Sequence, residues 1–333
     1  MEKTAVPGPL PQTESGVSAP FSASDLLLLL MTFIWGSNFT VIKLVLGDFQ
    51  PFAFNALRFV IASAFMIAVA LATRQTFNMA HGDRWQFLFL GLLSNVLYQM
   101  LFIMGVARTR AGNASLILAT TPLFTAIIGR LRGQEYFTAR GVTGLLLAFG
   151  GMALIIFAGN REVAFSDNLT GNLMMLGATI CWTWYSVGAR RLAQVYGSIK
   201  ATTLIMLWGT PILLLISAPA LARQEWSGVS AGGWVGVFAS GLLAIGLAYI
   251  IWNYGVRKIG ATRTAVYSNT TPIFALLVAW PVLGEAPTLG QVAGAVVILT
   301  GIYLVRNGLI HTIAPAEAAA QEMRRICLRP GKN

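Results

Sequence analysis

Charged residues are scarce in this sequence. Of its 333 residues only 11% are Asp, Glu, Lys or Arg, whereas 56% are hydrophobic and the mean hydropathy is +0.69. Soluble domains carry about 25% charged residues. The shortage therefore excludes an ordinary soluble domain and indicates a protein whose solvent is mostly lipid.

Cysteine and histidine are also scarce, at two residues each. Cys181 lies in an apolar run and Cys327 near the end of the chain, so the pair provides no disulfide framework. His81 and His311 fall in polar connecting segments, which leaves no ligand set for a metal cluster. We therefore expect no metal and no cofactor.

Acidic residues are absent from the apolar runs, since all twelve fall in tails, loops or helix ends. An intramembrane enzyme needs paired carboxylates, a histidine-based metal site, or a nucleophile with a base at depth. The absence of such groups argues against an enzyme. The net charge of +11 does not indicate nucleic acid either, because the basic residues lie between apolar runs and form no patch on a soluble fold.

Long apolar runs are abundant after a polar segment, 1–24, which we expect to be a disordered tail. Each run has roughly the twenty residues that a helix needs to cross a bilayer. The runs are continuous, whereas the strands of a barrel alternate in polarity. We predict an all-α membrane protein with ten transmembrane helices at 25–46, 52–73, 84–106, 112–131, 138–159, 169–189, 199–219, 232–254, 262–283 and 288–307.

The 23 Lys and Arg residues are distributed unevenly between the two sides of such a bundle. With ten helices both termini lie on one side, and most basic residues fall on that side. Basic residues favour the cytoplasmic face of a membrane. We therefore predict that both termini, including a C-terminal tail over 309–333, are cytoplasmic.

Part of the sequence repeats at a constant offset of 150 residues. TTPLF at 120–124 returns as TTPIF at 270–274, GLL at 91–93 returns as GLL at 241–243, and Glu135 matches Glu285. Similar apolar composition does not explain a shared proline and a shared loop glutamate. We infer two five-helix repeats, 25–160 and 161–308. Because five is odd, the second repeat runs upside down relative to the first, an inverted topology found in many secondary transporters, with a central cavity near the midplane.

The residues that recur also resemble a known family. WGSNF at 35–39, RF at 58–59, the two TTP phrases, and GE at 284–285 before a glycine-spaced last helix are similar to the EamA-type family of the drug/metabolite transporter superfamily. The first repeat departs from the pattern with GQE at 133–135. The resemblance implies export of small metabolites or amino acids from a bacterial cytoplasm, and hence a multi-pass protein of the inner membrane.

Polar and aromatic residues at mid-depth are the candidates for substrate binding. An amide in lipid is costly, so such residues face the bundle interior, either as hydrogen bonds between helices or as a cavity wall. The candidates are Asn38, Tyr98, Gln99, Thr121, Trp182, Tyr185, Trp252, Tyr267 and Thr271. Together they predict an aromatic, uncharged pocket that suits an apolar or aromatic metabolite and suits a phosphorylated one poorly.

Two ionisable residues have alternative interpretations. Arg58 is the clear charge inside a run; it either contacts a substrate carboxylate or, as we favour, snorkels outward or bonds helix-end carbonyls. Glu285 is the residual candidate for ion coupling, but we favour a cap at the start of helix 288–307. Without a buried acid or histidine as proton relay, we hypothesise a uniporter or exchanger that works as a monomer in the lipid bilayer. The alternatives are a nucleotide-sugar carrier, a channel and, least favoured, an intramembrane enzyme.

The prolines of the two TTP phrases are candidate hinges. Proline has no N–H to donate, so Pro122 frees the carbonyl of Leu118 and Pro272 frees that of Ser268. Neighbouring threonine hydroxyls can bond freed carbonyls. We predict kinks at Pro122 and Pro272 that widen the cavity and let each half bend in turn.

Overall fold

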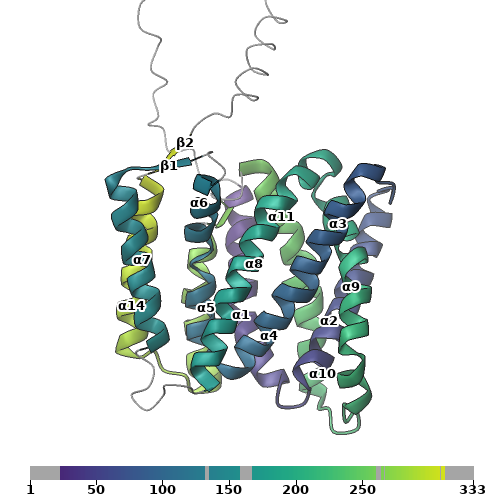
Figure 1. Ribbon diagram of the computed structural model, residues 1–333. Helices are drawn as coiled ribbons and strands as arrows, with labels where there is room; N and C mark the ends of the chain where they lie inside the picture. The colour runs from purple at the N-terminus through teal and green to yellow at the C-terminus, as the bar shows by residue number, and fades with distance from the viewer. Residues whose placement is uncertain are drawn as a thin grey trace, which may run out of the picture.

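The computed structural model describes residues 23–131, 135–157, 167–259, 264–265, 267–307 and 309–311. Nearly all of these residues lie in helices that run alongside one another (Figure 1). Both predicted tails, apart from 23–24 and 309–311, and the predicted boundary between the repeats at 160–161 lie outside the described residues.

The first half of the chain contains helices that match the expected runs to within a few residues. The helix in the third run includes a π-helical stretch, labelled η2. The elements are α1 (Ala23–Val45), α2 (Pro51–Ala72), the 3-10 turn η1 (His81–Asp83), α3 (Arg84–Gly91), η2 (Leu92–Leu97), α4 (Tyr98–Arg108), α5 (Ala111–Leu118), α6 (Thr121–Leu131), β1 (Glu135–Phe137) and α7 (Ala139–Phe157).

The second half has a similar order of helices, but its short strand follows the last helix, whereas β1 precedes α7. Two of its helices extend beyond the runs expected at 169–189 and 232–254. The elements are α8 (Asp167–Tyr196), α9 (Ser198–Arg223), α10 (Ala231–Ala239), the π-helical η3 (Ser240–Leu247), α11 (Ala248–Ile259), the 3-10 turn η4 (Ser268–Thr270), α13 (Thr271–Leu283), α14 (Leu289–Asn307) and β2 (Leu309–His311).

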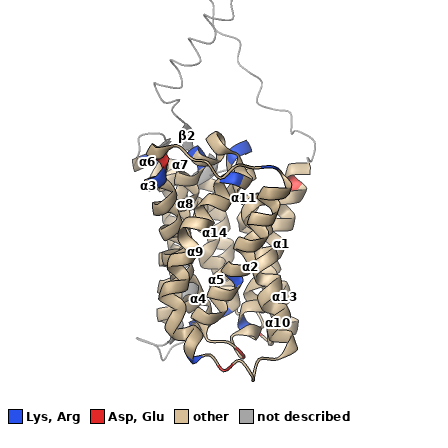
Figure 2. Cartoon of the chain, turned by 90° about the vertical axis from the view of Figure 1, so that its right-hand side faces the viewer, with Lys and Arg blue, Asp and Glu red and all other residues tan. Residues whose placement is uncertain are grey.

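Length and apolar composition make the fold a multi-pass membrane type. Within the described residues, six helical stretches are long and apolar enough to cross a membrane: 23–45, 51–72, 81–108, 111–131, 198–223 and 231–259. Two shorter apolar helical stretches, 268–283 and 289–304, add to them. In Figure 2 most Lys and Arg residues gather at the two ends of the helices, as a lipid-facing middle requires. The predicted membrane character is confirmed.

The fold is all-α apart from one short pair of strands. β1 and β2 form a short antiparallel pair, in which Glu135 faces His311 and Phe137 faces Leu309. These six paired residues satisfy backbone groups that follow α6 and α14, and they join the connection between α6 and α7 to the segment that follows α14. Runs of three residues lie below the length at which a strand pattern stands out in a sequence.

Local chemistry sets several helix ends. Pro51 occupies the first turn of α2, where its missing N–H costs nothing. The hydroxyl of Ser230 accepts from the N–H of Gly233 at the start of α10, and that hydroxyl in turn donates to Asp48 at 2.5 Å. Gly284 ends α13 with φ of +67°, a left-handed conformation that favours glycine.

The helices α7 and α14 pack as a pair at one side of the bundle (Figure 1). A methyl group on Gly151 would lie 2.9 Å from the carbonyl oxygen of Gly294 and from the nitrogen of Ile298. A methyl group on Gly301 would lie 2.6 Å from the carbonyl oxygen of Gly144 and 2.5 Å from the nitrogen of Ala148. Small residues thus let the two backbones touch, as expected between helices in lipid.

The irregular helical turns recur at the repeat offset. The π-helical η2 at 92–97 corresponds to 242–247, which lies inside η3. The break between α5 and α6 at 119–120 corresponds to 269–270, inside η4. The contacts between α7 and α14 are also exchanged by the offset, because 151 with 294 and 298 becomes 301 with 144 and 148. The two halves therefore share local geometry as well as sequence.

Candidate functional site

A cavity lies at the centre of the bundle. It forms where helices of both halves are interrupted or locally widened, around η2, η3, η4 and the break between α5 and α6. Its wall is mostly apolar and aromatic, with a few polar side chains. The lining residues are Trp35, Asn38, Phe39, Arg58, Tyr98, Gln99, Phe102, Ser115, Leu118, Ala119, Thr121, Trp182, Ala244, Ile245, Tyr249, Ser268 and Thr271.

Six of the nine predicted binding residues line this cavity, and the structure therefore brings them together. They are Asn38, Tyr98, Gln99, Thr121, Trp182 and Thr271. The positions agree with the prediction that mid-depth polar and aromatic residues face the interior. Whether these side chains bind a substrate stays a prediction.

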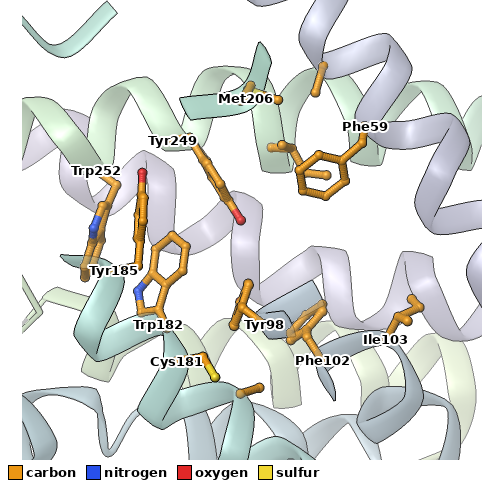
Figure 3. Packing of buried hydrophobic residues seen from close by; sticks show 14 of the residues in the cluster. Phe59, Tyr98, Phe102, Ile103, Cys181, Trp182, Tyr185, Met206, Tyr249 and Trp252 are labelled. Carbon is orange, nitrogen blue, oxygen red and sulfur yellow. The ribbon is translucent and has the colours of Figure 1, made fainter. Parts of the chain in front are cut away.

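Trp182 is the centre of the aromatic wall (Figure 3). Its ring lies 5.0 Å from that of Tyr98 and 5.2 Å from that of Tyr249, and Trp35 meets it edge-on at 5.5 Å. The indole N–H of Trp35 donates to the carbonyl of Ala244 at 2.9 Å, which fixes that ring. Such an array offers flat apolar surface with defined orientations, which suits a ring or a branched apolar group.

Tyr185 and Trp252 lie behind this wall and do not line the cavity. Trp252 is fully buried, with its ring 5.2 Å from Trp182. The hydroxyl of Tyr185 accepts from the side-chain amide of Asn253 at 2.9 Å, and the same amide donates to Thr202 at 2.9 Å. These two aromatic residues support the ring of Trp182 from the rear.

Tyr267 lies apart from the cavity. Its hydroxyl donates to the carboxylate of Asp25, close to the start of α1. This bond ties the segment before η4 to the first helix. Depth in the run suggested a cavity residue, but the side chain contacts Asp25 near the start of α1 and does not line the cavity.

Arg58 corrects the expectation of an uncharged pocket. The side chain is 1% exposed and lines the cavity, so it does not snorkel outward. Its Nε donates to Asn55 at 2.8 Å, one terminal nitrogen donates to Gln99, and the other donates to Ser240 at 3.3 Å. All three acceptors are side chains, so the favoured interpretation with helix-end carbonyls is wrong.

Gln99 joins Arg58 to the aromatic wall. Its amide nitrogen donates to the hydroxyl of Tyr249 at 2.9 Å, while its amide oxygen accepts from Arg58. Gln99 and Tyr249 are 150 residues apart, so they occupy equivalent positions of the two halves and touch each other. That relation was a usable signal for Tyr249, which sequence reasoning did not select. Ser240 and Phe102 carried no comparable signal.

The two TTP phrases form helix breaks in which proline lies at the second position of the new helix. At the first break the hydroxyl of Thr121 donates to the carbonyl of Leu118 at 2.6 Å. Thr120 donates in the same way to Ile117 at 2.6 Å. The hydrogen bond predicted from a threonine hydroxyl to the carbonyl that Pro122 leaves free is therefore present. The predicted kink within one helix is instead an interruption between α5 and α6.

The second break differs in its threonines. Thr270 donates to the carbonyl of Tyr267 at 2.8 Å and lies 2.8 Å from the hydroxyl oxygen of Thr32. The hydroxyl of Thr271 is buried and finds no partner among the described residues. Thr271 lines the cavity, so its hydroxyl is placed to meet a bound molecule. The expectation that all four threonines serve the backbone therefore fails for Thr271.

Glu285 caps a different helix from the expected one. Its carboxylate accepts from the backbone N–H of Ala111 at 2.9 Å, at the start of α5. Arg110 donates to the carbonyl of Ala286 at 3.0 Å across the same junction. A carboxylate at a helix N-terminus is favoured by the helix dipole. The contact joins the two halves at one end of the bundle.

Comparison with known proteins agrees with this architecture. Residues 22–157 and 169–307 each match the EamA-like transporter family. An uncharacterized transporter of Bacillus subtilis, YyaM, is 28% identical over 86% of this chain and 94% of its own length. An uncharacterized transporter of Archaeoglobus fulgidus is also 28% identical, over 85% of this chain and 97% of its own length.

A solved crystal structure shows the same fold. It superposes with a TM-score of 0.64 at 19% sequence identity, covering 90% of this chain and 98% of that one. The likeness at this identity concerns the fold alone. The two family matches cover most of the chain, one in each half, and they agree with the resemblance drawn from the TTP and WGSNF phrases. The chain belongs to the EamA-like transporter family.

Proposed function

We propose that this transporter carries small metabolites with an apolar or aromatic body, such as amino acids, out of the cytoplasm across the bacterial inner membrane. The aromatic cavity at the middle of the bundle carries the proposal. A cavity with flat ring surfaces and few polar groups binds a small, mainly apolar molecule. The lining side chains have no carboxylate or imidazole that would start a reaction on it.

The proposed architecture is ten membrane helices in two inverted repeats. Residue 144 contacts residue 301, and residue 151 contacts residue 294. The residue numbers rise along α7 while they fall along α14, so the two helices run antiparallel. The offset of 150 exchanges these contacts. A two-fold axis that exchanges two antiparallel helices stands perpendicular to them. For helices that cross a bilayer, such an axis lies in the membrane plane, which supports inverted topology.

Alternating access is the proposed mechanism. Inverted halves can exchange conformations, so a site between them faces each side in turn. The breaks at Pro122 and Pro272 offer places to bend, and the junction of Glu285 with α5 ties the two halves together at one end. Without an acid in the cavity wall, the proposed mode is uniport or exchange by a monomer.

Orientation follows from the ends of the helices. The end that carries Arg84, Arg130, Lys200 and Lys258 also holds the start of α1. A hydrogen bond of 2.7 Å from Lys258 to Ser24 places the end of α11 beside it. This basic end is the proposed cytoplasmic face.

The nucleotide-sugar carrier is the less favoured alternative. A diphosphate carries several negative charges and calls for a cluster of Arg or Lys. The cavity wall contains Arg58 as its only charged residue in the part of the chain that the structure describes.

Counterflow in proteoliposomes tests the proposal. Proteoliposomes that contain the purified protein are loaded with one unlabelled natural amino acid at a time. Uptake of the same amino acid in labelled form is then followed. We expect saturable counterflow for aromatic and aliphatic members. Trp182→Ala removes the central ring and should lower uptake severalfold. Trp85→Ala, at a residue 76% exposed, is the matched control and should leave uptake unchanged.

Two results would count against the proposal. A flat response to all aromatic and aliphatic amino acids would remove the substrate class. Equal uptake by the Trp182→Ala and Trp85→Ala proteins, at equal amounts in the vesicles, would remove the central cavity as the binding site.

A further inference from the structure

The cavity contains a buried cation without a counter-ion. Arg58 is 1% exposed, and no carboxylate lies within salt-bridge distance of it among the described residues. Buried charges in proteins are normally paired, because removing an ion from water is costly. We propose that the missing partner is the carboxylate of the substrate, and that this transporter selects monocarboxylates with an apolar or aromatic body. The inference rests on the proposed function, since it places the substrate in this cavity.

The hydrogen bonds of the guanidinium leave donors for a ligand. Arginine has five N–H groups, and the side chains of Asn55, Gln99 and Ser240 accept from three of them. Two remain, which matches the two oxygens of one carboxylate. Arginine binds carboxylates in this two-point manner. The same three side chains hold the guanidinium still, so little further ordering is needed on binding.

Neutral aromatic rings surround the guanidinium of Arg58. The guanidinium carbon lies 5.1 Å from the ring centre of Phe54 and 5.7 Å from that of Phe102. Aromatic faces attract cations, but they leave the net charge in place. A monoanion would neutralise the wall, whereas a cation would add to its charge.

The rest of the wall sets the shape of the ligand. The rings of Trp182 and Tyr98 lie on the same cavity as Arg58, and they offer apolar surface for the body of the molecule. The unpartnered hydroxyl of Thr271 and the amide of Asn38 offer hydrogen bonds. Among the described residues, no acidic side chain lines the wall and could pair with an ammonium group. A carboxylate without an amine should therefore bind at least as tightly as the amino acid.

Four compounds with one phenyl ring separate these contributions. They are 3-phenylpropionate (carboxylate), phenylalanine (carboxylate and amine), phenethylamine (amine) and 3-phenylpropanamide (neutral). Binding to the purified protein is measured by calorimetry, and counterflow is measured in proteoliposomes. We expect 3-phenylpropionate to bind at least tenfold more tightly than the neutral amide and the amine. Equal affinity for the carboxylate and the neutral amide would overturn the inference.

Variants locate the effect at Arg58. Arg58→Gln should remove the preference for the carboxylate over the amide, while Arg58→Lys, which keeps the charge but loses the two-point geometry, should retain part of it. Arg223→Gln, an exposed arginine at the end of α9, is the control and should bind like the unaltered protein. If Arg58→Gln does not yield folded protein, Arg58→Lys and the ligand series still decide. A preference that survives unchanged in Arg58→Lys and Arg58→Gln would overturn the inference.

Failure of the inference and of the proposed function are distinguishable. Saturable counterflow of the neutral amide with no advantage for the carboxylate would refute only the carboxylate site. An absence of counterflow for all four compounds and for the amino acids would refute the proposed function itself.

Discussion

Thr270 and Thr271 are neighbours with opposite surroundings. Thr270 is bonded to Tyr267 and Thr32, whereas the buried hydroxyl of Thr271 has no partner in the part of the chain described and lines the cavity. An unpartnered buried hydroxyl costs about 1–3 kcal/mol. A protein keeps a destabilising hydroxyl where that group has a function. We expect the hydroxyl of Thr271 to form a hydrogen bond with a substrate bound in the cavity.

Replacing each threonine by valine tests this at the residue scale. We expect Thr271→Val to raise the melting temperature in detergent, because an orphaned hydroxyl is removed, and to weaken substrate binding severalfold. We expect Thr270→Val to lower the melting temperature, because each lost hydrogen bond removes roughly 1 kcal/mol of stability. Melting curves and calorimetric binding check both expectations. A lower melting temperature for Thr271→Val, with unaltered binding, would show that the hydroxyl is structural.

At the scale of elements, the interruption before α13 is the feature most open to test. Pro272 lies at the second position of α13, after the 3-10 turn η4. An alanine there can donate its N–H to the carbonyl of Ser268, so the α-helix can extend backward through the turn. A continuous helix would remove the proposed bending point.

We therefore expect Pro272→Ala to slow counterflow severalfold at saturating substrate, while the melting temperature stays the same or rises. The control is Pro211→Ala, at an exposed position inside α9 and away from the cavity wall. Counterflow rates of equal amounts of the three proteins provide the measurement. A Pro272→Ala rate equal to that of the unaltered protein would argue against a hinge.

At the scale of the whole molecule, the charged ends support the proposed orientation. Figure 2 shows basic residues gathered at the end that holds α11 and the start of α1. We expect fusions of a reporter to either terminus to be active when the reporter works only in the cytoplasm. A reporter that works only outside the cytoplasm should be silent at both termini. Activity of the second reporter at either end would overturn the orientation and, with it, the basis for export.

The sequence by itself determined that this is a membrane protein, where most of its helices lie and that it contains an internal repeat. Hydropathy over a run of twenty residues, a proline inside such a run and a constant offset are properties of the chain alone. For the same reason the TTP breaks and the depth of Trp182 were predictable. The full interruption between α5 and α6, where a kink was predicted, and the π-helical turns were less predictable, because several helical hydrogen-bond patterns satisfy the same backbone.

Only the tertiary structure decided which side chains share the cavity. A helix in lipid is apolar on every face, so its sequence says little about rotation or about its neighbours. Arg58 was expected to snorkel outward or to bond helix-end carbonyls, and Glu285 was expected to cap the helix that follows it. Their partners, Gln99 and Ala111, come from other helices. Such contacts form because a buried polar group must be bonded, and the nearest acceptor or donor is set by how the helices pack.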